Sequence, residues 1–268
     1  NKLGSVTLSG GAGAGGPLAV LLIAIVAAEC GKAVSKETKV DILVTPLVTI
    51  LIGVALSAMI APAIGSAASS IGAFVEWATI LQPFWMGILV SVVVGIALTL
   101  PISSAAICAA LGLTGLAGGA AVAGCCAQMV GFAVMSFREN RWGGLISQGL
   151  GTSMLQMGNI VKNPKIWIPP ILTSAITGPI ATCLFRFQMN DPSGGVASGM
   201  GTCGMVGPIG VYAGWVNDVA NSVKAAITGT DYMAMALICI VLPAVLTWVF
   251  GWMLRKIGWI GKNDLKLD

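Results

Sequence analysis

Long apolar runs alternate with short polar stretches along this chain. A membrane-spanning helix needs about 20 mainly apolar residues, so runs near that length, closed by charge or by Gly and Pro, predict spans. Five such runs are residues 42–64, 84–100, 114–137, 166–187 and 232–260. A sixth run, 17–29, follows the Gly-rich stretch 9–16 and is short enough to predict a partial or broken span. The pattern therefore predicts an all-α, polytopic membrane protein.

Three segments between these runs have a different pattern. Residues 65–82 mix Ile71 and Phe74 with serines and Glu76, which predicts an amphipathic helix at the membrane interface or, alternatively, a loop-forming segment. Residues 143–161 carry amide and hydroxyl side chains at near-helical spacing, so they predict a re-entrant hairpin or a cavity-lining helix. Residues 188–212 are rich in Gly and Met and predict a loop that enters a cavity.

Composition excludes a water-soluble domain. The 268 residues are 56% hydrophobic and 9% charged, whereas globular domains carry about a quarter charged residues. We therefore expect one membrane-embedded domain, residues 1–268, preceded by a missing N-terminal segment because the chain starts at Asn1 without Met. The net charge of +4 indicates contact with anionic lipid headgroups rather than nucleic acid. The Lys-rich loop 32–39 and the basic segment 255–266 are the candidates for the cytoplasmic side.

The residues usually found in catalytic sites are scarce. Histidine is absent, and no clustered carboxylates or cysteine beside a base are found, so we predict no catalytic residue, metal or cofactor. The seven cysteines lack CxxC spacing and indicate small apolar core residues. Two GxGxxG matches, at Gly11, Gly13 and Gly16 and at Gly199, Gly201 and Gly204, lack the βαβ context of a dinucleotide site. They favour close packing or positive φ instead.

Neutral polar residues within apolar surroundings are the main candidates for solute binding, because amides and hydroxyls suit a solute with many hydroxyl groups. They are Gln148, Thr152, Gln156, Asn159, Asn163 and, on the neighbouring span, Gln128. Hydrogen bonding between helices is the alternative for each of them. Ser103 and Ser104 follow Pro101, where they line a broken helix or only cap the next one. Glu29 adds an acid beside an apolar run.

The run Asn163-Pro164-Lys165-Ile166-Trp167-Ile168-Pro169-Pro170 resembles the Asn-Pro to Ile-Pro helix entry of IIC components of bacterial sugar phosphotransferase systems. With residues 39–49, 98–107 and 124–137, it resembles the IIC-like perfringolysin-regulator family of Gram-positive bacteria, over about residues 17–210. Typical IIC domains carry a Glu upstream of the Asn-Pro, where this chain has Thr152.

The resemblance implies a homodimeric helical fold in the bacterial plasma membrane, with re-entrant hairpins, an amphipathic connector and alternating access to a central solute site. It also implies separate IIA and IIB proteins as partners. We therefore expect a transporter of a small polar, sugar-like solute, the permease subunit of such a system. The alternative is a membrane sensor or regulatory scaffold that keeps the IIC fold and binds a solute without moving it.

Overall fold

The computed structural model describes residues 2–3, 6–7, 16–35, 40–190 and 195–267. Apart from the paired two-residue strands β1 (Lys2–Leu3) and β2 (Val6–Thr7), the regular elements of these residues are helices. The chain divides into two compact units, residues 1–72 and 73–268. The sequence-based prediction of a single domain stays a prediction.

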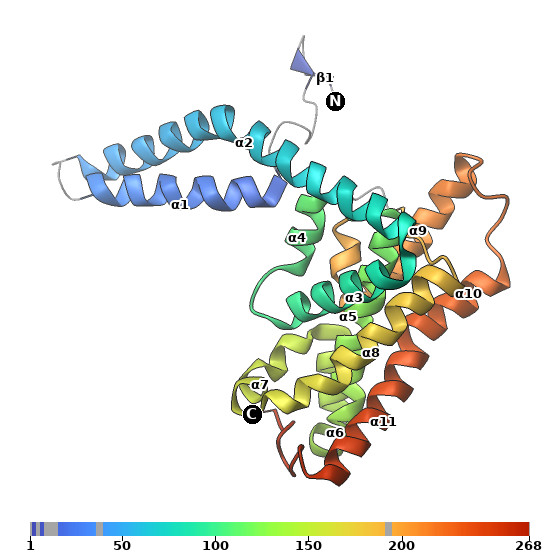
Figure 1. Ribbon diagram of the computed structural model, residues 1–268. Coiled ribbons are helices and arrows are strands. Elements are labelled where there is room, and N and C mark those ends of the chain that lie inside the picture. Colours follow the sequence, from blue (N-terminus) through green and yellow to red (C-terminus); the bar gives the residue numbers. More distant parts are fainter. Residues whose placement is uncertain (1, 4–5, 8–15, 36–39, 191–194, 268) are drawn as a thin grey trace. The chain divides into compact units, whose positions relative to one another are not determined.

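The first unit contains α1 (Gly16–Val34) and the first part of α2 (Asp41–Leu81), which lie side by side in Figure 1. Gly31 of α1 faces the Thr49 hydroxyl, where a side chain would collide. Helix α1 runs 19 residues, beyond the partial span predicted at 17–29.

The boundary predicted between residues 64 and 65 is absent, because both sides of it belong to α2. The sequence separates a span at 42–64 from an amphipathic helix at 65–82, but α2 is continuous over 41 residues. The serines that indicated a change of element donate to carbonyls of the preceding turn, as Ser66 does to Ala63 at 2.9 Å and Ser70 does to Ser66 at 2.8 Å. Since these hydroxyls are satisfied within the helix, they do not end it.

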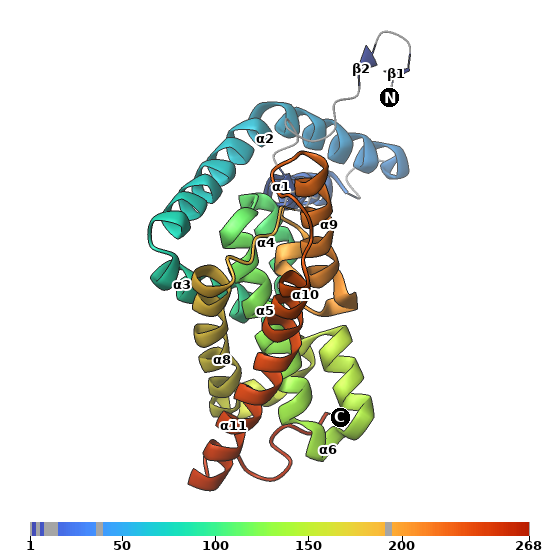
Figure 2. The ribbon, with the colours of Figure 1, turned by 90° about the vertical axis from the view of Figure 1, so that its right-hand side faces the viewer.

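The second unit is built around α5 (Gly115–Met135), nearly all of whose residues are buried. It packs against α3 (Pro83–Thr99), α8 (Ile168–Pro179) and α11 (Leu242–Ile257), which surround it in Figures 1 and 2. A side chain at Gly124 would overlap the Ser91 carbonyl of α3, and one at Gly131 would meet Thr247 of α11. The small residues of α5 therefore allow the close helix contacts predicted for them.

The described residues of the segment predicted as a cavity loop pack in part along α5. Met189 and Gly115 exchange two backbone hydrogen bonds of 2.9 Å, and α9 (Val206–Ala220) already begins inside the predicted range 188–212. Gly199 lies against the Ser104 carbonyl of α4 (Ser104–Leu111), and Gly201 and Gly204 have φ near +50°. These glycines serve packing and backbone conformation, as predicted. Gly11 and Gly13 of the first match lie outside the described residues.

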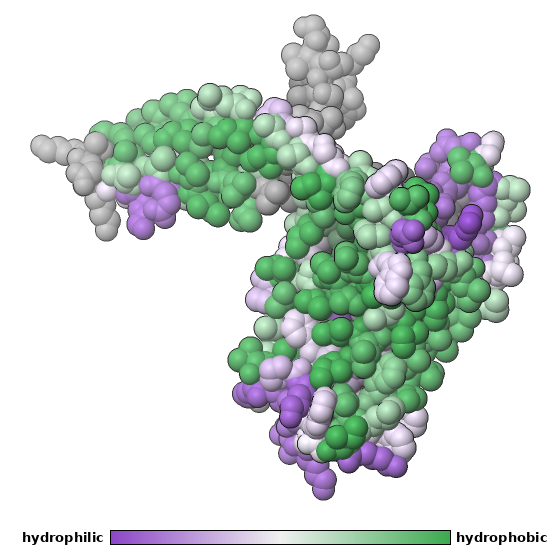
Figure 3. Space-filling view, viewed as in Figure 1, coloured by the Kyte–Doolittle hydropathy of each residue, from purple (hydrophilic) through white to green (hydrophobic). Residues whose placement is uncertain are grey.

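Within the described residues, four helical stretches are long and apolar enough to cross a membrane: Asp41–Leu81, Gly115–Met135, Pro164–Leu184 and Gly229–Ile257. The last contains α10 (Gly229–Ala236) and α11, and α3 is a shorter apolar helix. In Figure 3, hydrophobic residues cover the middle of the second unit, and hydrophilic residues gather at its two ends. These features confirm the predicted all-α, polytopic membrane fold.

Candidate functional site

A repeatedly interrupted helical segment leads from α6 (Phe137–Ile146) to α8. It consists of a π-helical turn (Ser147–Gly151), a 3-10 turn (Ser153–Gln156), α7 (Met157–Lys162) and a second 3-10 turn (Pro164–Trp167). Thr152 is extended, and its hydroxyl accepts from the Met154 amide at 3.2 Å. The Asn163 side-chain oxygen (Oδ1) accepts from the Lys165 backbone amide at 3.2 Å. Residues 143–161 are thus a broken helical stretch, and its side chains project in two directions. The predicted re-entrant hairpin or cavity-lining helix stays a prediction.

The first group, here called the helix network, comprises Thr99, Gln128, Ser153, Trp167 and Ser174. Gln128 is fully buried and accepts at its amide oxygen from the Trp167 indole at 3.0 Å and the Thr99 hydroxyl at 3.3 Å. Its amide nitrogen donates to Ser174 at 3.4 Å. The Thr99 and Ser153 hydroxyls are 2.9 Å apart, so this network ties the interrupted segment to α3, α5 and α8.

The second group, here called the tail network, joins four amide side chains of the interrupted segment to residues 259–267. Gln148 donates to the Ser136 hydroxyl at 2.8 Å and accepts from Gln156 at 2.9 Å. Asn159 donates to the Gln156 oxygen at 2.8 Å. Gln148 and Gln156 are completely buried. Three of the predicted solute-binding residues therefore form one chain of amides.

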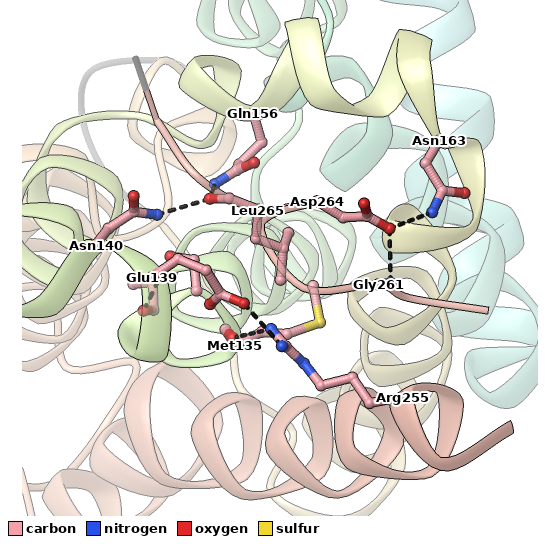
Figure 4. Close-up of polar contacts among 11 residues, drawn as sticks. Met135, Glu139, Asn140, Gln156, Asn163, Arg255, Gly261, Asp264 and Leu265 are labelled. Atoms are coloured by element: carbon pink, nitrogen blue, oxygen red, sulfur yellow. Dashed lines mark hydrogen bonds and ion pairs between the residues drawn. The ribbon is translucent and has the colours of Figure 1, made fainter. Parts of the chain in front are cut away.

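Residues 259–267, here called the tail, turn back after α11 because Gly258 adopts the left-handed conformation at φ 80°. In Figure 1 the tail returns to the vicinity of α7. The Leu265 carbonyl accepts from Asn140 at 2.7 Å and from Gln156 at 3.0 Å, and the Lys266 carbonyl accepts from Asn159 at 2.9 Å. Asn163 donates to the Asp264 carboxylate at 2.7 Å (Figure 4).

A buried ion pair lies beside the tail. The Arg255 guanidinium of α11 is 2.7 Å from one oxygen of Glu139 in α6 and donates to the Met135 carbonyl at 3.1 Å (Figure 4). Only 7% of the Glu139 side chain is exposed, and its second oxygen has no hydrogen-bond partner within the described residues. A buried carboxylate oxygen of this kind is a free acceptor.

The remaining predicted site residues lie elsewhere. Ser103 caps α4 by accepting from the Ala106 amide at 3.2 Å, and Ser104 donates to the Gly199 carbonyl at 2.7 Å. Glu29 belongs to the first unit, where it is exposed and 3.7 Å from Lys32. The structure brings together Gln148, Gln156, Asn159 and Asn163, and it places Gln128 in the other network. Solute binding by any of them stays a prediction.

Several residues of both networks are missing from the sequence-based candidates. Thr99, Trp167 and Ser174 lie in or next to predicted spans, where single polar residues are common. Asn140 lies in a charged stretch, Arg138-Glu139-Asn140-Arg141, that indicated only the end of a span. The available signal was Trp167, which follows Asn163-Pro164 inside an apolar run, because an indole N–H in apolar surroundings needs an acceptor.

Apolar helices packed closely around α5 and joined by an interrupted segment with buried polar side chains are typical of membrane proteins of the solute-transporter class. The family model described as "Phosphotransferase system, EIIC" matches residues 3–267. The chain therefore belongs to the EIIC family, the membrane permease components of sugar phosphotransferase systems. A search of curated proteins and a search of solved structures each returned no match.

Proposed function

We propose that this protein moves a small polar, sugar-like solute across the bacterial plasma membrane through a site on the interrupted segment. The observation that carries the proposal is the concentration of neutral amides and hydroxyls on both sides of residues 147–167, within a family of sugar permeases. Amides both donate and accept, which suits a ligand rich in hydroxyl groups. Interrupted helices supply such groups where a regular helix has none free.

The distribution of basic residues supports an orientation for the second unit. Eight of its ten Lys and Arg residues belong to the end that carries the tail: Arg138, Arg141, Lys162, Lys165, Arg255, Lys256, Lys262 and Lys266. Only Arg186 and Lys224 lie elsewhere in the unit. Because basic residues accumulate on the cytoplasmic side, we assign the tail to that side.

As a member of the EIIC family, the protein would work with separate IIA and IIB proteins that supply the phosphoryl group. We also propose a homodimer and retain the perfringolysin-regulator-like subfamily as part of this proposal, on the sequence resemblance described above.

Thr152 stands where typical IIC domains carry a Glu, and its hydroxyl accepts from the Met154 amide. A substrate contact at this position would therefore be weaker than one made by a carboxylate.

The test combines binding with uptake. Detergent-solubilised protein is heated with glucose, gluconate or mannitol, since a ligand that prefers the folded state raises the melting temperature. A solute that stabilises the protein is then offered in labelled form to proteoliposomes. Uptake above that of protein-free vesicles supports the permease, and a panel without any stabilising solute contradicts a sugar-like substrate.

A regulatory sensor is the second candidate. The specific observation in its favour is that the amides of the tail network are already paired with the protein itself. A sensor would show stabilisation by a solute without uptake, whereas the permease shows both. The same two measurements therefore separate the candidates.

A further inference from the structure

The tail makes its polar contacts mainly through its backbone. Carbonyl oxygens of Trp259, Leu265 and Lys266 accept from side-chain amides of the second unit at 2.7–3.0 Å. The Leu267 amide donates to the Asn140 oxygen at 2.8 Å. The side-chain amides thus bind several closely spaced acceptors, the carbonyl oxygens, and one donor, the Leu267 N–H. A solute with many hydroxyl groups offers the same kinds of acceptor and donor.

Two apolar side chains and one carboxylate hold the tail in this position. Leu265 is fully buried and Ile260 is 3% exposed, both in a cluster with Phe132, Ile160 and Ile166. Asp264 accepts from Asn163 and from the Gly261 amide, each at 2.7 Å. Leu265 and Ile260 therefore hold the tail without using the amides that bind its backbone. Asp264 does so through Asn163, which also donates to the Trp259 carbonyl.

A solute at the tail network needs the donors that the tail occupies. Asn159, for example, donates one amide hydrogen to Gln156 and the other to the Lys266 carbonyl, so it has no further donor to offer. Gln156 likewise donates to Gln148 and to Leu265. Departure of the tail would free one donor on each side chain and open the region beside Glu139, whose second oxygen accepts no hydrogen bond from the part of the chain that the structure describes.

We propose that residues 259–267 are a built-in competitor that occupies the amide site of the interrupted segment and must leave before a polar solute binds there. The inference rests on the proposed function, because it assigns the solute to the tail network. If the tail competes in this way, the apparent association constant of the solute is its intrinsic association constant multiplied by the fraction of molecules whose tail is open.

The experiment uses the full chain in detergent with glucose, gluconate and mannitol as probes. The variants are Leu265→Ala, which removes the apolar anchor, and Asp264→Ala, which removes the contact with Asn163. Lys262→Ala is the matched control, because this exposed tail side chain makes no hydrogen bond or ion pair with the described residues. Hydrogen exchange of tail peptides reports tail opening, and the concentration dependence of the melting temperature reports solute binding.

The expected result has two parts. In each of the two variants, the rate of tail exchange and the solute affinity rise by a similar factor. This factor is about ten or more for Leu265→Ala. Lys262→Ala changes neither quantity. In the wild type, saturating solute increases exchange of the tail. Because this second part needs no variant, the test holds even where Leu265→Ala impairs folding.

Two results overturn the inference while leaving a transporter intact: a solute that binds the wild type and both variants equally, or one whose binding leaves tail exchange unchanged or lowers it. A solute that stabilises only the variants supports the inference strongly. If no probe stabilises any form even though tail exchange is raised in the variants, the proposed sugar-like substrate fails and the competitor role fails with it.

Discussion

The helix network and the tail network begin on the same interrupted segment but are stabilised differently. The helix network joins side chains from α3, α5 and α8, so it depends on how closely these helices approach. The tail network joins side chains to the backbone of a nonhelical segment about 100 residues further along the chain. The first should therefore change only when the fold changes, whereas the second can open while the fold persists.

The largest expected effect comes from Gly124→Val, which forces apart the helices α3 and α5 that carry the helix network. The new side chain would overlap the Ser91 carbonyl, and Gly124 itself accepts from the Ser174 hydroxyl at 3.3 Å. Since a backbone atom cannot move aside, we expect a loss of at least about 3 kcal/mol and aggregated protein on size exclusion in detergent. Gly143→Ala is the control, because no neighbouring atom lies within 4 Å of its added carbon. Equal behaviour of the two variants would contradict the close α3–α5 packing.

Arg255→Met should have the next largest effect, on the side of the tail network. It leaves the buried Glu139 carboxylate without its cation, which should cost about 3 kcal/mol, the low end for a buried pair, because 19% of the Arg255 side chain is exposed. Thermal unfolding in detergent measures the loss. The double variant Glu139→Gln with Arg255→Met should recover much of the stability, because no buried charge then remains. Additive losses in the double variant would show that the two residues do not interact as a pair.

Gln128→Leu sharpens the comparison by removing the central amide of the helix network. It leaves the Trp167 indole without its acceptor and removes the 3.3 Å contact of the Thr99 hydroxyl, so we expect a loss of about 1–3 kcal/mol. Gln82→Leu is the matched control, since Gln82 is exposed and its side chain makes no capping hydrogen bond. Melting temperatures of the two variants check the prediction. Hydrogen exchange of the tail should stay unchanged in both, and a faster exchange in Gln128→Leu would show that the networks are coupled.

The fold could be predicted from sequence because the bilayer imposes length and apolarity on each span. The apolar runs at 114–137 and 232–260 correspond closely to Gly115–Met135 and Gly229–Ile257. The continuity of α2 could not be predicted, because serines that bond to their own helix have the same pattern as serines exposed at an interface. Polarity alone does not distinguish these cases.

The candidate site was partly predictable for a similar reason. Amides in an apolar context must find partners, so Gln148, Gln156 and Asn159 were recognisable as a group. Their partners were not, because the tail contributes backbone carbonyls, which every residue has and which leave no pattern in the sequence. Glu29 was chosen on charge beside an apolar run, yet it is an exposed residue paired with Lys32.

The smallest expected effect, Asn159→Ala, distinguishes the two roles of one amide. Its bond to the Lys266 carbonyl is exposed to solvent, so the loss of stability should be only about 0.5–1 kcal/mol. If a solute binds the Asn159 amide once the tail has opened, the variant loses this solute contact and also loses the bond that holds the competing tail. The two changes oppose each other, and the apparent affinity should shift less than threefold, whereas Leu265→Ala, which removes only an anchor, shifts it more. A large loss of affinity in Asn159→Ala with unchanged tail exchange would instead mean that this amide binds solute without holding the tail.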